Sequence, residues 1–116
     1  MFSDERISLL AVVIADSESP IGLGGVIGGQ NSEIENTTKT IFLESATFND
    51  YNNRSTAESF QLRTEATLRF EKGLSPRLAP IALRRACSLI QEIAGGQVCQ
   101  GIIDINSVEN DLNPTV

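Results

Sequence analysis

The sequence predicts an α+β protein with a layered, mostly antiparallel or mixed β core, one long packed helix and one short helix. Two observations support this fold class. Short apolar or β-branched runs, bounded by glycine, proline, asparagine and serine, recur through roughly the first two thirds of the chain, which is typical of strands and turns. A later run instead repeats its apolar residues at three- and four-residue steps, which is typical of a helix.

Each expected strand rests on its own local pattern. The β-branched run that Asp16 closes predicts a buried strand, and the glycines of the next run indicate bends or a closely passing backbone. From Thr64 to Glu71 small or apolar side chains alternate with charged ones, so that Thr64, Ala66, Leu68 and Phe70 would share one strand face. The expected strands are residues 9–15, 21–27, 39–46, 66–71 and 97–105.

The long helix is expected between Ser75–Pro76 and Gly95–Gly96. Serine is a frequent N-cap, proline is accepted in the first turn, and glycine ends helices. Its apolar stripe consists of Leu78, Ile81, Ala82, Ala86, Leu89, Ile90 and Ile93. A short helix should begin near Asn53 or Ser55 and reach about Gln61.

The 116 residues fit one domain, residues 9–106, with a polar lead-in at 1–8 and a linker or frayed tail at 107–116. No apolar run approaches the roughly 18 residues of a membrane span, and the N-terminus does not resemble a secretory signal. Cys87 and Cys99 are interpreted as small core residues in a reducing, cytoplasmic compartment. Because the chain has no histidine and no Cys-x-x-Cys, no metal site is expected.

The formal net charge of −6 argues against strong direct binding of nucleic acid. The one basic cluster, Arg84–Arg85 with Arg77 nearby, is interpreted as a solvated helix face. If the domain meets nucleic acid, other parts of a larger assembly must supply most of the affinity.

Five short segments stand in order along the chain: Ile14-Ala15-Asp16, Gly28-Gly29, Leu43-Glu44-Ser45-Ala46, Arg63-Thr64-Glu65-Ala66-Thr67 and Arg69-Phe70-Glu71-Lys72-Gly73. In this order they resemble the editing domain of the β subunit of bacterial phenylalanyl-tRNA synthetase. The resemblance covers roughly residues 9 to 106. The chain lacks the histidine-bearing Pro-Leu-His-Ala-Phe-Asp-like segment that precedes the first family motif, so it is expected to hold only the C-terminal part of that domain.

The resemblance gives Glu44 the role of accepting a hydrogen bond from the phenolic hydroxyl of tyrosine. Bound phenylalanine would leave that carboxylate buried and unpaired, at a cost of roughly 1–3 kcal/mol. The residues alone leave two alternatives: an exposed strand face, or a structural ion pair with Arg63 or Arg69.

Two other sets of residues match the editing pocket. Ala66 would leave room for the aromatic ring, and the Thr64 hydroxyl would help to position the ester or a water. Both also fit the interpretation of ordinary small strand residues. Gly25, Gly28 and Gly29 would let backbone N–H groups approach the ligand. No Lys-Ser/Thr follows these glycines, so a P-loop is excluded.

The implied reaction is hydrolysis of the ester that joins tyrosine to tRNA(Phe). Because the chain has no histidine, Ser-His and Cys-His pairs are excluded. An oriented water is therefore preferred and no catalytic residue is assigned.

The resemblance implies a cytoplasmic parent ligase that is a heterotetramer of two α and two β subunits. ATP and magnesium would serve the α subunit, and this segment would bind no cofactor and be inactive alone. The alternatives are a structural module of the synthetase that has lost editing, and a non-catalytic domain that binds RNA or a small molecule.

Overall fold

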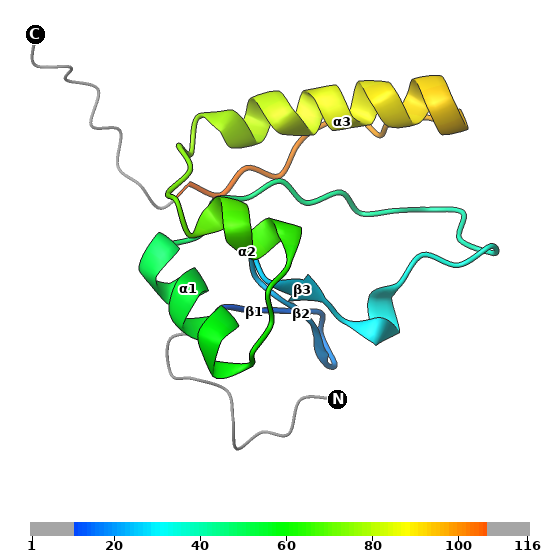
Figure 1. Ribbon diagram of the computed structural model, residues 1–116. Helices are drawn as coiled ribbons and strands as arrows, with labels where there is room; N and C mark the ends of the chain where they lie inside the picture. Colours follow the sequence, from blue (N-terminus) through cyan, green and yellow to red (C-terminus); the bar gives the residue numbers. More distant parts are fainter. Residues whose placement is uncertain (1–10, 107–116) are drawn as a thin grey trace, which may run out of the picture.

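The computed structural model describes residues 11–106. The expected lead-in 1–8, the beginning of the strand at 9–15 and the expected tail 107–116 lie outside the described residues. Within them the chain is α+β: an antiparallel sheet of three strands precedes three α-helices (Figure 1). The fold class expected from the sequence is therefore confirmed.

The sheet is a meander of β1 (Val13–Ala15), β2 (Pro20–Leu23) and β3 (Ile27–Gly28). At the turn between β1 and β2, Asp16 Oδ1 accepts hydrogen bonds from the backbone N–H groups of Glu18, at 2.8 Å, and Ser19, at 2.7 Å. These bonds favour the charged form and lower the pKa of the Asp16 carboxyl. The 3-10 helix η2 (Gln30–Ser32) follows β3.

The strand expected at residues 21–27 is in fact two strands joined by a tight turn at Gly24, Gly25 and Val26. The Val26 N–H donates to the Leu23 carbonyl at 3.0 Å, and Gly25 has a φ of +69°, which a residue with a side chain rarely adopts. A run of glycines in one apolar segment thus encodes a hairpin instead of a bent strand.

Helix α1 (Asp50–Ser59) begins one residue after Asn49, whose side chain accepts a hydrogen bond from the Asn52 N–H. The sequence correctly predicted a short helix, but the expected caps Asn53 and Ser55 lie inside it. Asn53 is 3% exposed and its Nδ2 donates to the Gly24 carbonyl at 3.4 Å. The helix ends in a left-handed Gln61, with φ of 55°, and the next N–H donates to the Ala57 carbonyl, as in a Schellman motif.

Helix α2 (Glu65–Phe70) replaces the strand expected at residues 66–71. Thr64 and Thr67 form a capping box: the Thr67 N–H donates to Thr64 Oγ1 at 3.2 Å, and the Thr64 N–H donates to Thr67 Oγ1 at 3.0 Å. These bonds fix the first turn of a helix. The strand prediction is wrong because six residues show too little of the 3.6-residue period to outweigh an accidental alternation.

Helix α3 (Leu78–Ala94) is the long helix that the sequence predicted. A turn precedes it, in which the Leu78 and Ala79 N–H groups donate to the Ser75 and Pro76 carbonyls. Gly95, with φ of 72°, ends it, and the Gly95 N–H donates to the Gln91 carbonyl. The predicted bounds are correct to within about two residues.

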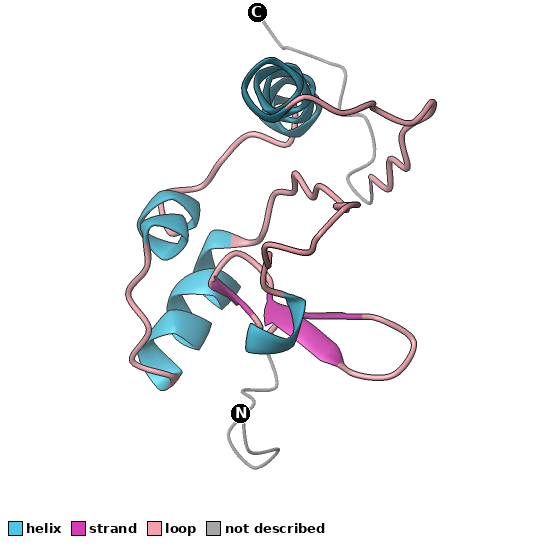
Figure 2. Ribbon diagram, turned by 90° about the vertical axis from the view of Figure 1, so that its right-hand side faces the viewer, coloured by secondary structure: helices cyan, strands magenta, loops and turns pink. Residues whose placement is uncertain are grey.

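Two segments expected to be strands are extended but unpaired. Residues 39–46 and 97–105 contain no strand, and the described residues provide neither with a β ladder. Figures 1 and 2 show the segment before α1 running between α3 and the sheet. Because a strand needs a hydrogen-bonded neighbour, an apolar pattern alone does not make these segments strands.

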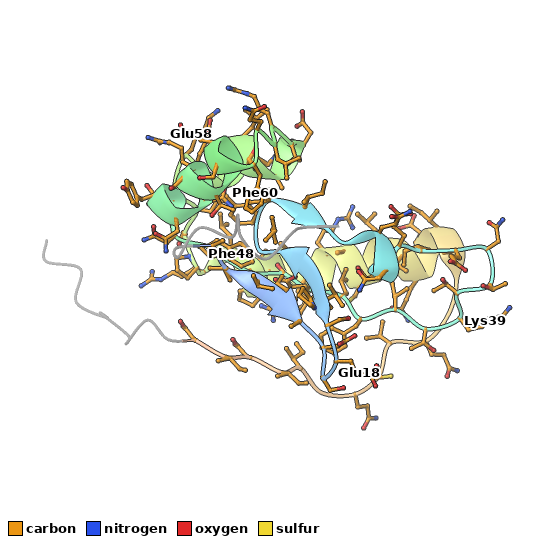
Figure 3. All side chains as sticks on the ribbon, turned by 90° about the horizontal axis from the view of Figure 1, so that it is seen from below. Glu18, Lys39, Phe48, Glu58 and Phe60 are labelled. Carbon is orange, nitrogen blue, oxygen red and sulfur yellow. The ribbon has the colours of Figure 1, made fainter. Side chains whose placement is uncertain are left out.

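The compact part of the molecule lies around the ring of Phe48, between the hairpin and the helices (Figure 3). Phe48 meets Phe70 edge to face, with ring centroids 5.2 Å apart and an interplanar angle of 76°, a favourable aromatic geometry. Leu23 and Val26 are the buried hydrophobic residues among those described. No described helix has the length and apolar character needed to cross a membrane.

Candidate functional site

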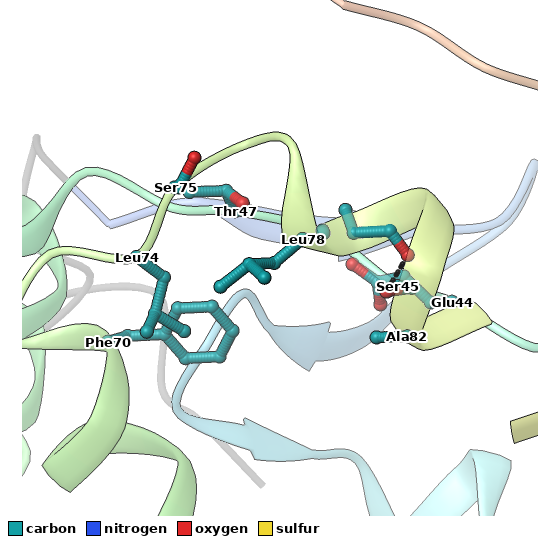
Figure 4. A pocket seen from close by; sticks show the side chains of 10 residues that line it. Glu44, Ser45, Thr47, Phe70, Leu74, Ser75, Leu78 and Ala82 are labelled. Carbon is teal, nitrogen blue, oxygen red and sulfur yellow. Dashed lines mark hydrogen bonds between the residues drawn. The ribbon is translucent and has the colours of Figure 1, made fainter. Parts of the chain in front are cut away.

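An open cleft of about 270 Å³ lies between the extended segment at residues 44–47, the connection that follows α2, and the first turns of α3 (Figure 4). Its surface is mainly apolar, with the Glu44 carboxylate and several hydroxyl groups as its polar members. The lining residues from the extended segment are Glu44, Ser45, Ala46 and Thr47. Facing them are Phe70, Leu74, Ser75, Leu78, Ala79 and Ala82.

Glu44 is the charged side chain of this cleft. The residue as a whole is exposed, in agreement with the alternative of an exposed face, while partial burial of its carboxylate raises its pKa above the ordinary 4.5. Within the described part of the chain it has no hydrogen bond or ion pair. The alternative ion pair with Arg69 is not formed, since Arg69 Nη1 contacts Glu65 Oε2 at 3.3 Å.

Ser45 connects the two long walls of the cleft. Its Oγ donates a hydrogen bond of 2.8 Å to the carbonyl oxygen of Ala79, in the first turn of α3. The two residues are 34 positions apart in the sequence. The dashed line in Figure 4 marks this bond beside Glu44 and Ala82.

The Thr64 side chain is used within the fold. Besides capping α2, its Oγ1 donates a hydrogen bond of 2.7 Å to the Val26 carbonyl, which ties α2 to the hairpin turn. The single hydroxyl hydrogen of Thr64 is thereby engaged. Its oxygen also accepts from Thr67, so this conformation leaves little of the hydroxyl for an ester or a water.

Ala66 and Glu44 do not line the same cleft in the described residues. Ala66 is half-buried in the first turn of α2, whereas the α2 residue that reaches the cleft is Phe70. The sequence interpretation placed Thr64, Ala66, Leu68 and Phe70 on one face because it assumed a strand. In a helix, residues two positions apart are separated by about 200°, so Leu68 does not share a face with Ala66 or Phe70. Ala66 and Phe70 are four positions apart and lie on the same side of α2, but Phe70 is at the end of the helix that reaches the cleft.

The three glycines singled out by the sequence have different surroundings. A Cβ on Gly25 would come within 2.7 Å of the Phe48 ring, and one on Gly29 would lie 2.8 Å from the Ile21 carbonyl oxygen. Close packing therefore requires glycine, which has no side chain, at these two positions. A Cβ on Gly28, which lies in β3 opposite Gly22, would meet nothing within 4 Å, so close packing does not require glycine at this position.

Sequence reasoning missed the wall that α3 contributes. Leu78 and Ala82 were assigned to the apolar stripe of a packed helix, and their separation of four residues places them on one helix face. Phe70 was likewise assigned to a strand. An apolar stripe does not reveal whether it meets a core or a cleft, so the sequence could not identify these lining residues.

A second open cleft, of about 240 Å³, lies between α1 and α2. Arg54 crosses it, and its Nη2 donates to the Glu71 carbonyl at 3.0 Å. Arg63 also lines it, together with Glu58 and Glu71. With two acidic side chains beside two basic ones, it has no excess of positive charge that would attract an anion.

Neither cleft has the ligands of a metal site. No group of three or more His, Cys, Asp and Glu residues suited to a metal ion occurs within residues 11–106. Cys87 and Cys99 are both free thiols. The acidic oxygen ligands that Mg²⁺ prefers are therefore not gathered in this part of the chain.

Comparison with known proteins places the chain in a family. The B3/4 domain family matches residues 4–95. The phenylalanine–tRNA ligase β subunit of Dehalococcoides mccartyi strain 195 is 45% identical over 113 residues, which are 97% of this chain and 14% of that protein. The β subunit of Clostridium acetobutylicum is 42% identical over 112 residues, which are again 14% of its length. The β subunit of Geobacillus kaustophilus is 41% identical over 100 residues, which are 12% of its length.

The chain thus spans about a seventh of the curated relatives, while those relatives cover nearly all of the chain. The family match extends from before the hairpin to the end of α3, so it includes the Glu44 cleft. The chain belongs to the B3/4 domain family, and it is homologous to a segment of phenylalanine–tRNA ligase β subunits.

Proposed function

We propose that this chain supplies the tyrosine-recognising part of an editing site in a phenylalanine–tRNA ligase β subunit. The parent ligase would hydrolyse the ester of tyrosyl-tRNA(Phe) formed by mischarging. The observation that carries this proposal is the Glu44 carboxylate, an acceptor without a protein partner in a mainly apolar cleft. Such a group gains most from a ligand that donates a hydrogen bond to it.

The cleft suits a phenol better than a plain aromatic ring. Leu78, Phe70 and Leu74 offer apolar surface to a ring, while Glu44 offers an acceptor to a hydroxyl. Tyrosine would satisfy both, whereas phenylalanine would displace water from the carboxylate without replacing its hydrogen bonds. The difference, roughly 1–3 kcal/mol, corresponds to about five- to 150-fold in binding.

In this proposal the residues of the chain bind and orient the aminoacyl group, and none serves as nucleophile or general base. An activated ester needs an oriented water and donors for the developing oxyanion. Gly28, which has open space at its Cβ position, is the glycine proposed to let a ligand approach the backbone. Ala66, Gly25 and Gly29 would act indirectly, by keeping α2 and the hairpin closely packed.

The remaining properties of the parent are part of the same proposal. They are the aminoacylation reaction, the partner α subunit in a heterotetramer, tRNA(Phe) and a cytosolic setting. As the family resemblance implies, ATP and magnesium would serve the α subunit of the ligase.

The test uses a chimera in which this sequence replaces the matching segment of the Dehalococcoides β subunit, assembled with its α subunit. The chimera should release tyrosine from tyrosyl-tRNA(Phe). Glu44→Ala should slow that release at least tenfold and leave charging with phenylalanine unchanged. Glu33→Ala, which removes an exposed carboxylate that does not line the cleft, serves as the matched control.

A second candidate function is a structural module that no longer edits. It is favoured by the use of Thr64 for capping α2 and holding the Val26 carbonyl. The chimera separates the two candidates: equal tyrosine release by the parent chimera and its Glu44→Ala variant would reject the editing proposal in favour of the structural module.

A further inference from the structure

We infer that the first turns of α3 form the wall opposite Glu44 in the tyrosine-binding cleft, and that Ser45 is the positioning residue that holds this wall in place. The inference rests on the proposed function and adds to it a specificity wall that the sequence assigned to the core. Two independent observations support it: a hydrogen bond between the walls and the composition of the opposing surface.

The hydrogen bond joins the two walls next to the recognition group. Ser45 follows Glu44 directly, and its Oγ contacts the Ala79 carbonyl at 2.8 Å. A helix carbonyl already has an intrahelical donor, but its oxygen has a second lone pair that a hydroxyl can use. Because the bond is partly buried, water competes with it less than at an open surface. Ser45 therefore sets the separation between the backbone at Glu44 and α3.

The opposing surface is small where Glu44 faces it. Ala79 and Ala82 line the cleft from α3. In Figure 4, Ala82 is drawn at the same end of the cleft as Glu44, Leu74 and Phe70 are at the other end, and Leu78 is between them. Two short side chains leave space beside the carboxylate, and the larger apolar side chains begin beyond that space. This gradient fits a ligand with a narrow polar end and an apolar ring behind it.

The other end of the cleft is held by a contact that does not involve α3. Phe48 follows the segment 44–47 directly, and its ring meets that of Phe70, in α2, edge to face with ring centroids 5.2 Å apart. A change at Ser45 leaves this aromatic pair in place, so α3 should move away from the segment 44–47 and widen the cleft without loss of the fold.

The experiment measures steady-state tyrosine release by the chimeric ligase described above. Ser45→Ala should raise the KM for tyrosyl-tRNA(Phe) about three- to tenfold, the range expected for one lost hydrogen bond, with kcat changed less than twofold. Ser45→Thr retains a hydroxyl and should restore the KM. Ser59→Ala, which removes an exposed hydroxyl bonded only within α1, is the matched control.

A second variant tests the wall directly. Ala82→Leu adds bulk to an exposed position that the fold can accept, and it should raise the same KM at least tenfold by filling the space beside Glu44. Ala94→Leu, at the other end of α3 and away from the cleft, should have no effect.

The outcomes distinguish the inference from the proposed function. A normal KM for Ser45→Ala or for Ala82→Leu, with tyrosine release still lost in Glu44→Ala, would overturn the inference and leave the editing proposal standing. Equal impairment of Ser45→Thr and Ser45→Ala would also overturn it, because the hydroxyl would then not be the cause. Normal release by Glu44→Ala would remove the proposed function itself.

Discussion

Glu44 is a carboxylate in surroundings that favour its neutral form. Partial burial raises its pKa above 4.5, and the described residues offer no hydrogen-bond donor that would offset the lost hydration. A group with a raised pKa in the folded state binds protons more readily there than in the unfolded chain. Its ionised form therefore opposes folding at neutral pH, and this opposition disappears once the carboxyl is protonated in both states.

Glu44→Gln should accordingly stabilise the chain at pH 7. The amide removes the charge and keeps the size of the side chain, so the midpoint of urea unfolding should rise. The advantage should shrink as the pH falls through the range around 4.5 and vanish by about pH 3.5, where glutamate is protonated in both states. Glu33→Gln provides the control, and an advantage of Glu44→Gln that persists at pH 3.5 would contradict the assigned cause.

At the scale of elements, α2 owes its conformation to two threonines. Thr64 caps the helix, shares a capping box with Thr67 and donates to the Val26 carbonyl at 2.7 Å. A six-residue helix has few internal hydrogen bonds, so its stability comes largely from such end contacts and from tertiary packing. The segment Arg63-Thr64-Glu65-Ala66-Thr67, which matches a family motif and leads into an expected strand, is in this fold the start of a helix.

Thr64→Ala should reduce the free energy of unfolding by about 2 kcal/mol. About half of this comes from the lost N-cap and about half from the lost bond to Val26. Thr64→Ser keeps both hydrogen bonds and should lose less than about 0.5 kcal/mol. Urea unfolding followed by far-ultraviolet circular dichroism measures both variants, and equal losses for alanine and serine would show that the methyl group matters instead.

The elements also show what sequence patterns can establish. Helix α3 has 17 residues, a complete apolar stripe and a glycine end, so its period and its limits were predictable. Helix α2 has six residues, and its Thr-x-x-Thr start was a stronger local signal than its alternation. The segments 39–46 and 97–105 have strand-like composition, but pairing depends on neighbours that no local pattern specifies.

The candidate site was predictable to a similar extent. Glu44 was identified because a carboxylate within an apolar run is unusual and matches a family motif, and the structure does place it in a cleft. Ala66 was assigned to the same cavity through an assumed strand geometry, and it does not line this cleft. The α3 wall could not be foreseen, since it depends on how a helix lies against an extended segment more than thirty residues earlier.

At the scale of the whole molecule, apolar surface is distributed unevenly. Leu23 and Val26 are buried, whereas Phe42 is 88%, Ile103 78% and Ile105 90% exposed. Exposed apolar side chains also occur on α3 and along the last described segment. Large apolar side chains exposed to this degree are typical of surfaces that meet another part of a larger protein or a partner.

We therefore expect the isolated chain to bind an apolar dye such as ANS and to self-associate as its concentration rises. Association should strengthen with salt, because screening weakens the repulsion between chains of net charge −6. Replacing Ile103 and Ile105 by serine should reduce both dye binding and association, measured by fluorescence and sedimentation velocity. The urea midpoint should not change, since these side chains contribute little burial within the chain.

Leu23→Ser supplies the contrast: it places a hydroxyl in a site that is 4% exposed and should destabilise the fold by about 3 kcal/mol. A double serine variant that unfolds as readily as Leu23→Ser would mean that residues 103 and 105 belong to the core, which would contradict their assignment to the exposed apolar surface.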